Sequence, residues 1–132
     1  MLNLTELKNS EINTKPYNYI VLKNFISNQF LDKARKDYPV VPGPGSHPPN
    51  GLKIYGGFKL LMEELLGNDF RKVIENKFKV SLKDYPTMYT VRGYCRAKDG
   101  KIHTDSKTKV ITVLLYMNDD NWPSDNGRLR LL

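Results

Sequence analysis

The residues whose types and spacing could do chemistry in this 132-residue chain are His103 and Asp105. On an extended segment, residues two apart point to the same side, so the imidazole of His103 and the carboxylate of Asp105 can face one point in space. Two histidines and one carboxylate form the facial triad that binds Fe(II) and leaves positions open for a co-substrate and dioxygen. The triplet supplies two of those three ligands. A solvated His beside an Asp is the competing interpretation, because so short a pattern also arises by chance.

The segment Val110 to Met117 follows this triplet and is almost continuously apolar. Such a run predicts a strand that is covered on both faces. Thr112 and Tyr116 would share one face of it, and two hydroxyls on a buried face need hydrogen-bond partners. A bound carboxylate would supply one partner. Hydroxyls satisfied within the protein are the alternative, and the pattern leaves both open.

The elements that must position these residues begin with three expected helices. Ser27 is well placed as the N-cap of the first helix, which Pro39 would stop. Gly67 would end the second helix, and Asn68 or Asp69 would cap the third. The expected apolar faces are Phe30, Leu31, Ala34 and Tyr38 in the first, Phe58, Leu61, Met62 and Leu65 in the second, and Phe70, Val73, Ile74 and Phe78 in the third.

Other segments are expected to be extended or irregular. Residues 1–16 read as a flexible leader with room for a short helix, and Tyr17 to Leu22 is a β-prone run that continues towards Phe25. Pro39 to Gly57 holds five Pro and five Gly, which predicts a long loop that could form a mobile rim. Strands are expected at 89–96, 110–117 and 128–132, separated by turns at 98–100 and 118–126.

Helices followed by strands predict an α+β domain, with the helices packed on a largely antiparallel sheet. We expect one domain over residues 17–132, in which 17–86 supplies a strand, the helices and the loop, and 87–132 supplies the strands with the His-x-Asp motif. The last residues, 127–132, alternate like a half-buried strand without a partner, so we expect the chain to be the front part of a longer protein.

Composition narrows the class of protein further. The chain has 21 Lys and Arg against 14 Asp and Glu, a formal charge of +7, which favours an anionic partner such as a small carboxylate, nucleic acid or an acidic protein. A single cysteine, Cys95, excludes an internal disulfide framework and a Cys-rich zinc site. No apolar run approaches the roughly 20 residues of a membrane span, and the start is not a secretory signal. We therefore expect a cytoplasmic protein that does not bind membranes.

At the level of motifs, the last third of the chain resembles the iron(II)- and 2-oxoglutarate-dependent oxygenases, in particular the prolyl 4-hydroxylase-like branch. Three features carry the resemblance in this order along the chain: the His-x-Asp triplet in 91–105, a strand ending in Tyr-Met-Asn at 116–118, and Gly-x-Leu-Arg at 127–130. Their combination is much more specific than any one of them. The resemblance implies a double-stranded β-helix, or jelly-roll, core with helices supporting it.

The resemblance also implies roles for individual residues. His103 and Asp105 match the first two iron ligands, and Tyr116 matches the strand tyrosine that binds the distal carboxylate of 2-oxoglutarate. Tyr94 matches, less closely, an upstream tyrosine that faces the co-substrate, and Leu129 matches an apolar residue packed beside it. Two neighbours are added from strand alternation rather than from the family pattern: Arg92, on the face of Tyr94, and Thr112, on the face of Tyr116.

The chain departs from the family pattern at the third ligand. The distal iron-binding His and the basic residue that completes 2-oxoglutarate binding are expected on strands beyond Leu132. His47, the only other histidine, lies in the Pro/Gly loop and would ligate in reversed order. Cys95 is a poor substitute, because a thiolate is soft and oxidisable and strand alternation places it opposite Tyr94.

The function implied is a dioxygenase that couples decarboxylation of 2-oxoglutarate to hydroxylation of a C–H bond, in a peptidyl proline or an amino-acid-like substrate, using Fe(II), O₂ and ascorbate as a supporting reductant. The basic cluster around the motif would attract the dianionic co-substrate, whereas the alternative is that most of its side chains form a solvated rim. The cluster comprises Arg92, Arg96, Lys98, Lys101, Lys107 and Lys109. The alternative is a non-catalytic basic β module that binds nucleic acid or an acidic protein, with Tyr and Arg interleaved in the 89–96 strand. It leaves the His-x-Asp triplet unexplained, so nucleic acid is not the expected partner.

Overall fold

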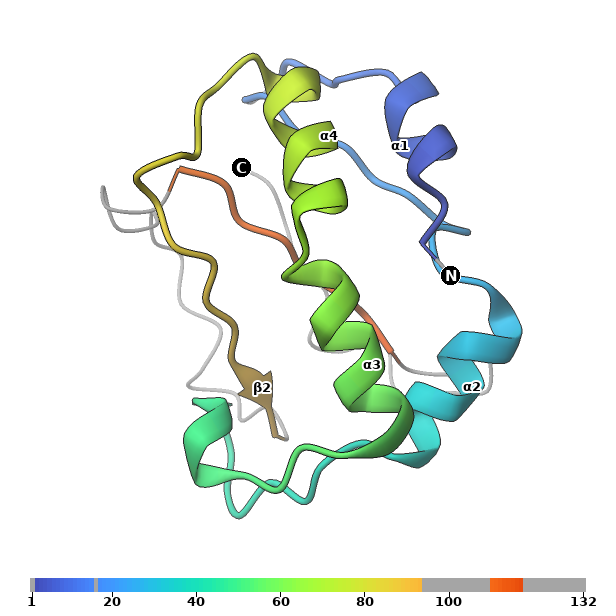
Figure 1. Cartoon of the computed structure of the whole chain (residues 1–132), viewed down its shortest axis with the longest axis vertical. Coiled ribbons are helices and arrows are strands. Elements are labelled where there is room, and N and C mark those ends of the chain that lie inside the picture. Colours follow the sequence, from blue (N-terminus) through green and yellow to red (C-terminus); the bar gives the residue numbers. More distant parts are fainter. Residues whose placement is uncertain (1, 16, 94–109, 118–132) are drawn as a thin grey trace.

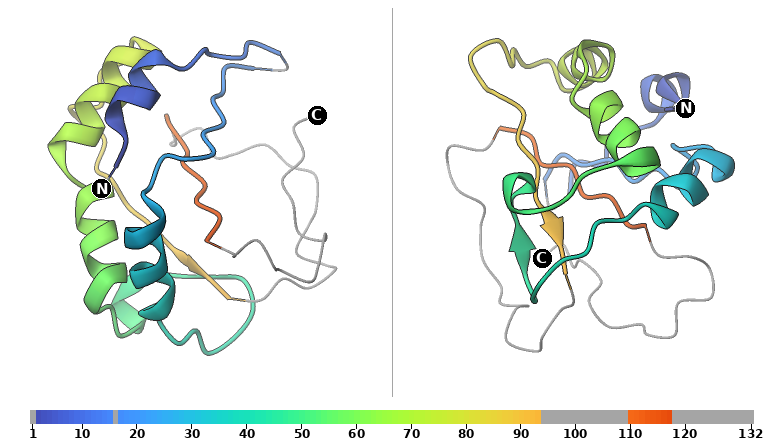
Figure 2. Two further views of the ribbon diagram at one scale, coloured as in Figure 1. Left: turned by 90° about the vertical axis from the view of Figure 1, so that its right-hand side faces the viewer. Right: turned by 60° about the horizontal axis from the view of Figure 1, so that its bottom comes forward.

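The computed structural model describes residues 2–15, 17–93 and 110–117. Its elements are α1 (Leu4–Asn9), α2 (Asn28–Lys36), β1 (Ser46–His47), the 3₁₀-helix η1 (Pro49–Gly51), α3 (Gly56–Leu65), α4 (Asn68–Phe78) and β2 (Val91–Arg92). The helices form one layer, and the chain around β2 and the segment 110–117 run along one side of it (Figures 1 and 2). The fold is therefore α+β, and the only sheet in the described ranges is the antiparallel pair of β1 and β2.

The three predicted helices are confirmed, with small differences at their ends. The Ser27 hydroxyl caps α2 by accepting from the backbone N–H of Phe30 at 3.4 Å. α3 ends at Leu65, two residues before Gly67. The N-cap of α4 is Gly67 itself, rather than Asn68 or Asp69 as predicted, so α4 begins directly after the turn that ends α3.

Two apolar clusters hold this layer together. The first lies between α2 and α3 and is closed by β2; its buried members are Ile26, Phe30, Ala34, Phe58, Leu61, Met62 and Val91. The second lies between α1 and α4; its buried members are Leu7, Phe70, Val73, Ile74 and Leu82. Because Leu7 is only 3% exposed, α1 is a packed part of the molecule, where the sequence predicted a flexible leader with at most a short helix.

The crossing of α2 over α3 depends on one close backbone approach. A Cβ added to Gly57 would lie 2.8 Å from the backbone carbonyl of Lys33, so the two helices meet where only glycine fits. The Asp37 carboxylate at the end of α2 then accepts from the Gly57 N–H at 2.6 Å. A side chain of one helix thereby satisfies a free N–H group in the first turn of the next.

Two predicted strands are wrong within the described residues. Tyr17 to Leu22 does not form a strand; a single isolated bridge joins its Tyr19 to Asn13. Another isolated bridge joins Leu2 to Ile26, just after this segment. The segment 110–117 is not a strand either, and it is not covered on both faces. In it, Val110, Val113, Leu114, Leu115 and Tyr116 are each at least 38% exposed.

The Pro/Gly segment 39–57 is less irregular than predicted. It contains β1 and η1, and β1 pairs with β2 in the register Ser46↔Arg92 and His47↔Val91. The Gly93 N–H donates to the Gly45 carbonyl at 2.8 Å and extends this contact. Of the predicted strand 89–96, the described part contains β2 alone. No helix in the ranges that the structure describes has the length and apolar character needed to cross a membrane.

Candidate functional site

The structure describes three of the seven candidate site residues, which are Arg92, Thr112 and Tyr116. The two predicted iron ligands, His103 and Asp105, lie outside the described residues, as do Tyr94 and Leu129. The predicted pocket shared by the two ligands and Tyr116 therefore stays a prediction. What the structure does describe is how the segments that carry the three remaining candidates are placed.

Arg92 lies on β2, next to the buried Val91, and its own side chain is on the exposed side of the strand. Its backbone carbonyl accepts a hydrogen bond from the Tyr38 hydroxyl at 2.8 Å. Ser46 is its antiparallel partner on β1. Arg92 is thus fixed from two sides, by the segment that follows α2 and by the Pro/Gly segment.

Thr112 and Tyr116 lie on the segment 110–117, which runs along the helical layer (Figure 2). Ile111 packs against the second cluster and Met117 against the first. Tyr116 is 56% exposed, so its hydroxyl does not lie on the buried strand face that the sequence predicted. The end of the segment is held by α2, because the Arg35 Nε–H donates to the Met117 carbonyl at 2.5 Å.

Arg35 and Tyr38 are functional candidates that the sequence analysis did not identify as such. The apolar spacing places Tyr38 on a helix face, and no pattern in the sequence marks Arg35. A tyrosine at the end of an apolar face carries a partial signal, since a half-buried phenol needs a hydrogen-bond partner. Burial raises the pKa of the Tyr38 hydroxyl above its usual value of 10.0, so the phenol remains a donor further into the alkaline range than a solvated tyrosine.

The second histidine of the chain, His47, has one ring nitrogen engaged by the Pro/Gly segment. The His47 Nε2 atom lies 3.1 Å from the carbonyl oxygens of both Gly43 and Pro44. Carbonyl oxygens only accept, so Nε2 carries the proton in this arrangement, and only Nδ1 of His47 is left to bind a metal. Among residues 2–15, 17–93 and 110–117, no three His, Cys, Asp or Glu side chains gather into a metal site.

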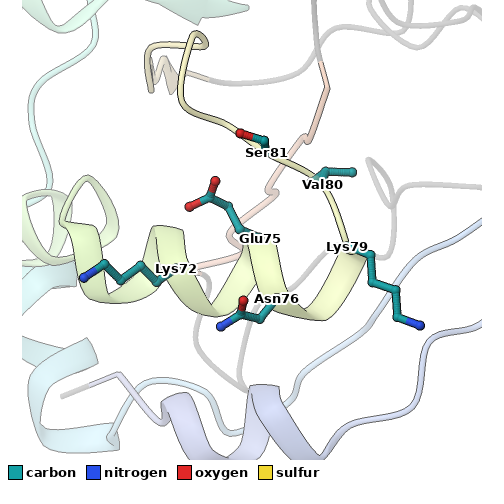
Figure 3. Close-up of a pocket in the computed structure, with 6 residues that line it drawn as sticks. All are labelled: Lys72, Glu75, Asn76, Lys79, Val80 and Ser81. Carbon is teal, nitrogen blue, oxygen red and sulfur yellow. The ribbon is translucent and has the colours of Figure 1, made fainter.

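Two hollows lie elsewhere on the described surface, and neither is lined by a candidate residue. One borders Arg71 and the segment 83–87. The other lies at the end of α4, beside Lys72, Glu75, Lys79 and Ser81 (Figure 3). Figure 3 shows the two lysines pointing away from each other, and the Glu75 carboxylate accepts from the Leu82 N–H at 2.8 Å. The ammonium groups of Lys72 and Lys79 therefore do not converge on one ligand.

Comparison with known proteins adds no relative: no protein-family model, no curated protein and no solved structure matches the chain significantly.

Proposed function

We propose that this chain is the front part of a non-haem Fe(II)- and 2-oxoglutarate-dependent dioxygenase, which hydroxylates a C–H bond of a prolyl residue or an amino-acid-like substrate and releases succinate and CO₂. The observation that carries the proposal is the ordered set of motifs: His103-x-Asp105, the Tyr-Met-Asn of 116–118 and the Gly-x-Leu-Arg of 127–130. Each motif has a role in the same reaction, which chance occurrence of one triplet would not explain.

The arrangement of the described segments supports the proposal at a coarser level. The helices form a single layer, and the segments that carry Arg92 and Tyr116 run along one side of it (Figure 2). A jelly-roll sheet supported by helices needs such an order of layers. The jelly roll itself is part of the proposal: residues 94–109 and 118–132 lie outside the described ranges, and the segment 110–117, which a jelly roll needs as a strand, is not paired as one in the described structure.

The donor chemistry of the two proposed ligands suits Fe(II), since one imidazole and one carboxylate belong to the facial triad. When bound, iron supplies the oxidant for C–H hydroxylation, while the protein supplies ligation, orientation and exclusion of side reactions. His103 and Asp105 would hold the metal, and Tyr116 would orient the distal carboxylate of 2-oxoglutarate. A further imidazole ligand and a basic partner for that carboxylate are proposed on strands after residue 132.

The experiment is aerobic succinate formation from 2-oxoglutarate with Fe(II) and ascorbate. It compares the 132-residue chain with a gene product extended through the proposed strands, each as wild type, Asp105→Ala and Asp84→Ala. Asp84 is an exposed carboxylate and serves as the matched control. We expect turnover only in the extended protein, because the two protein ligands of the 132-residue chain hold iron weakly. In the extended protein, Asp105→Ala should abolish turnover and Asp84→Ala should leave it unchanged.

Three results would contradict parts of the proposal. No turnover by either protein would overturn the dioxygenase assignment. Turnover that survives Asp105→Ala would overturn the ligand assignment. Asp105-dependent turnover by the 132-residue chain would show that another residue completes the site and that no later strand is needed.

A further inference from the structure

Two hydrogen bonds connect the end of α2 to the two segments that carry candidate co-substrate residues. Arg35 donates from Nε to the Met117 carbonyl at 2.5 Å, across 82 positions of sequence. Tyr38 donates from its hydroxyl to the Arg92 carbonyl at 2.8 Å, across 54 positions. The two donors are three residues apart. Arg35 in the last turn of α2 and Tyr38 just after the helix therefore contact two distant parts of the chain. Figure 1 shows the 110–117 segment ending beside α2.

Both donors are firmly fixed: Arg35 lies in α2, and Tyr38 directly follows its C-cap, Asp37. Phe30 and Ala34 anchor α2 in the first apolar cluster, and its close approach to Gly57 sets its position against α3. The Tyr38 ring packs edge-to-face on Phe58, with ring centroids 5.3 Å apart. A hydrogen bond from such an anchored element restricts its acceptor segment, because the donor has little freedom to follow it.

The two acceptor segments depend on such contacts to different degrees. The segment 110–117 has no ladder of backbone hydrogen bonds in the described structure, so a side-chain donor at its end restricts it directly. β2 is also held by its pairing with β1. A guanidinium donor makes a charge-assisted bond that is stronger than a phenol's neutral bond. Arg35 should therefore matter more than Tyr38.

We propose that Arg35 and Tyr38 are positioning residues that hold the segments of Tyr116 and Arg92 in one fixed arrangement, and thereby set the affinity of the site for 2-oxoglutarate. The affinity part rests on the proposed function, since it requires Tyr116 and Arg92 to face the co-substrate. The structural part stands on the two hydrogen bonds alone. Neither residue touches substrate in this proposal. Arg35 acts through the carbonyl of Met117, the neighbour of Tyr116, and Tyr38 acts through the carbonyl of Arg92 itself.

The four methionines of the chain provide a local readout for Arg35. In the 132-residue chain labelled with ¹³C-methyl methionine, Met117 reports on the held segment, the buried Met62 reports on the core, and Met88, which is 85% exposed, gives the solvent-exposed reference. We expect Arg35→Leu to move the Met117 signal towards that of Met88 and leave Met62 unchanged. Arg35→Lys keeps a charged donor and should restore part of the wild-type position. Lys36→Leu, on the same helix but exposed, should change neither signal.

The readout for Tyr38 is hydrogen exchange at Gly93, whose N–H is bonded to the Gly45 carbonyl. Tyr38→Phe keeps the ring on Phe58 and removes only the hydroxyl. Loss of one neutral hydrogen bond should accelerate exchange at Gly93 by about 5-fold. Exchange in α4 should stay unchanged, which separates a local release from general destabilisation.

The affinity part is tested in the extended gene product. We expect Arg35→Leu to raise KM for 2-oxoglutarate by about 10-fold with kcat largely kept. Arg35→Lys should recover part of the wild-type KM, and Tyr38→Phe should raise KM by a smaller factor. Unchanged Met117 and Gly93 signals would overturn the positioning role. Altered signals with an unchanged KM would overturn the link to affinity. Absence of turnover in the wild type would overturn that link together with the proposed function, while the methionine and exchange measurements still decide the positioning role.

Discussion

The helix α3 and the segment 110–117 are both rich in large apolar residues, yet they differ completely in burial. α3 buries Gly57, Phe58, Leu61 and Met62 against α2. The segment 110–117 has seven hydrophobic residues out of eight, and five of them are substantially exposed. Apolar composition alone therefore does not decide burial in this chain. The difference lies in the partner, because α3 meets α2 about twenty residues away, whereas a strand needs neighbours that align with it along its length.

The sharpest test of this comparison is a matched pair of leucine truncations. Leu61→Ala removes a side chain that is fully buried in the first cluster and should lower the free energy of unfolding by about 3 kcal/mol. Leu114→Ala removes one that is 55% exposed and should cost about 0.5 kcal/mol or less. Urea unfolding of the two variants and the wild type measures both. Equal losses would mean that the segment 110–117 is packed in solution as tightly as the helical core.

A second pair tests whether the α2–α3 contact is the fixed reference for the rest of the molecule. Gly57→Ala places a Cβ 2.8 Å from the Lys33 backbone and should destabilise the protein by about 1–3 kcal/mol, since neither backbone can move aside cheaply. Gly51→Ala is the control, because a Cβ there meets nothing within 4 Å. Thermal unfolding of both variants gives the comparison. A Gly57→Ala protein as stable as Gly51→Ala would show that the helices tolerate a wider separation.

The helical region could be predicted from the sequence because its signals are local. Ser27 as N-cap and the i, i+3, i+4 spacing of apolar residues specify α2, α3 and α4 within a few turns of chain. The extended region could not be predicted in this way. A strand forms only by pairing with another strand, and the local sequence does not indicate which segment that partner is. Tyr17 to Leu22 has β-forming residues and makes a single isolated bridge. The 110–117 segment has them too and lies on helices instead.

The candidate site divides in the same way. The chemical types and spacing of His103 and Asp105 are visible in the sequence, since a motif within three residues needs no fold to be found. Arg35 could not be found like this. Its contact with Met117 spans 82 positions, and nothing near Arg35 in the sequence marks that carbonyl as its acceptor. Residues that ligate leave a local pattern, whereas residues that position others need tertiary structure to be identified.

A smaller effect is expected at the carboxylate that joins α2 to α3. Asp37→Ala removes the acceptor for the Gly57 N–H and should cost about 1 kcal/mol, the usual value of a helix N-cap. Asp32→Ala is the control on the same helix. The Asp32 side chain is 72% exposed, so its salt bridge with Arg35 at 3.0 Å should contribute about 0.5 kcal/mol at most. Urea midpoints at neutral pH measure the two losses. Equal losses would indicate that the Asp37 contact is no more than a surface interaction.

The smallest expected effect is an alkaline one and concerns the tyrosine that follows α2. Burial raises the pKa of Tyr38 above its usual value of 10.0, so ionisation is harder in the folded than in the unfolded protein. The resulting stability is complete below pH 10 and is lost as the pH rises through the higher folded-state pKa, because only the unfolded state releases the proton readily there. Tyr38→Phe should therefore flatten the fall in unfolding free energy above pH 10. Burial also raises the pKa of Tyr89, so Tyr89 should account for part of the slope that remains.

Tyr17→Phe is the control, because Tyr17 is 53% exposed. Denaturant unfolding between pH 8 and pH 11 measures the slopes. An unchanged slope in Tyr38→Phe would mean that the Tyr38 hydroxyl is as solvated as that of Tyr17.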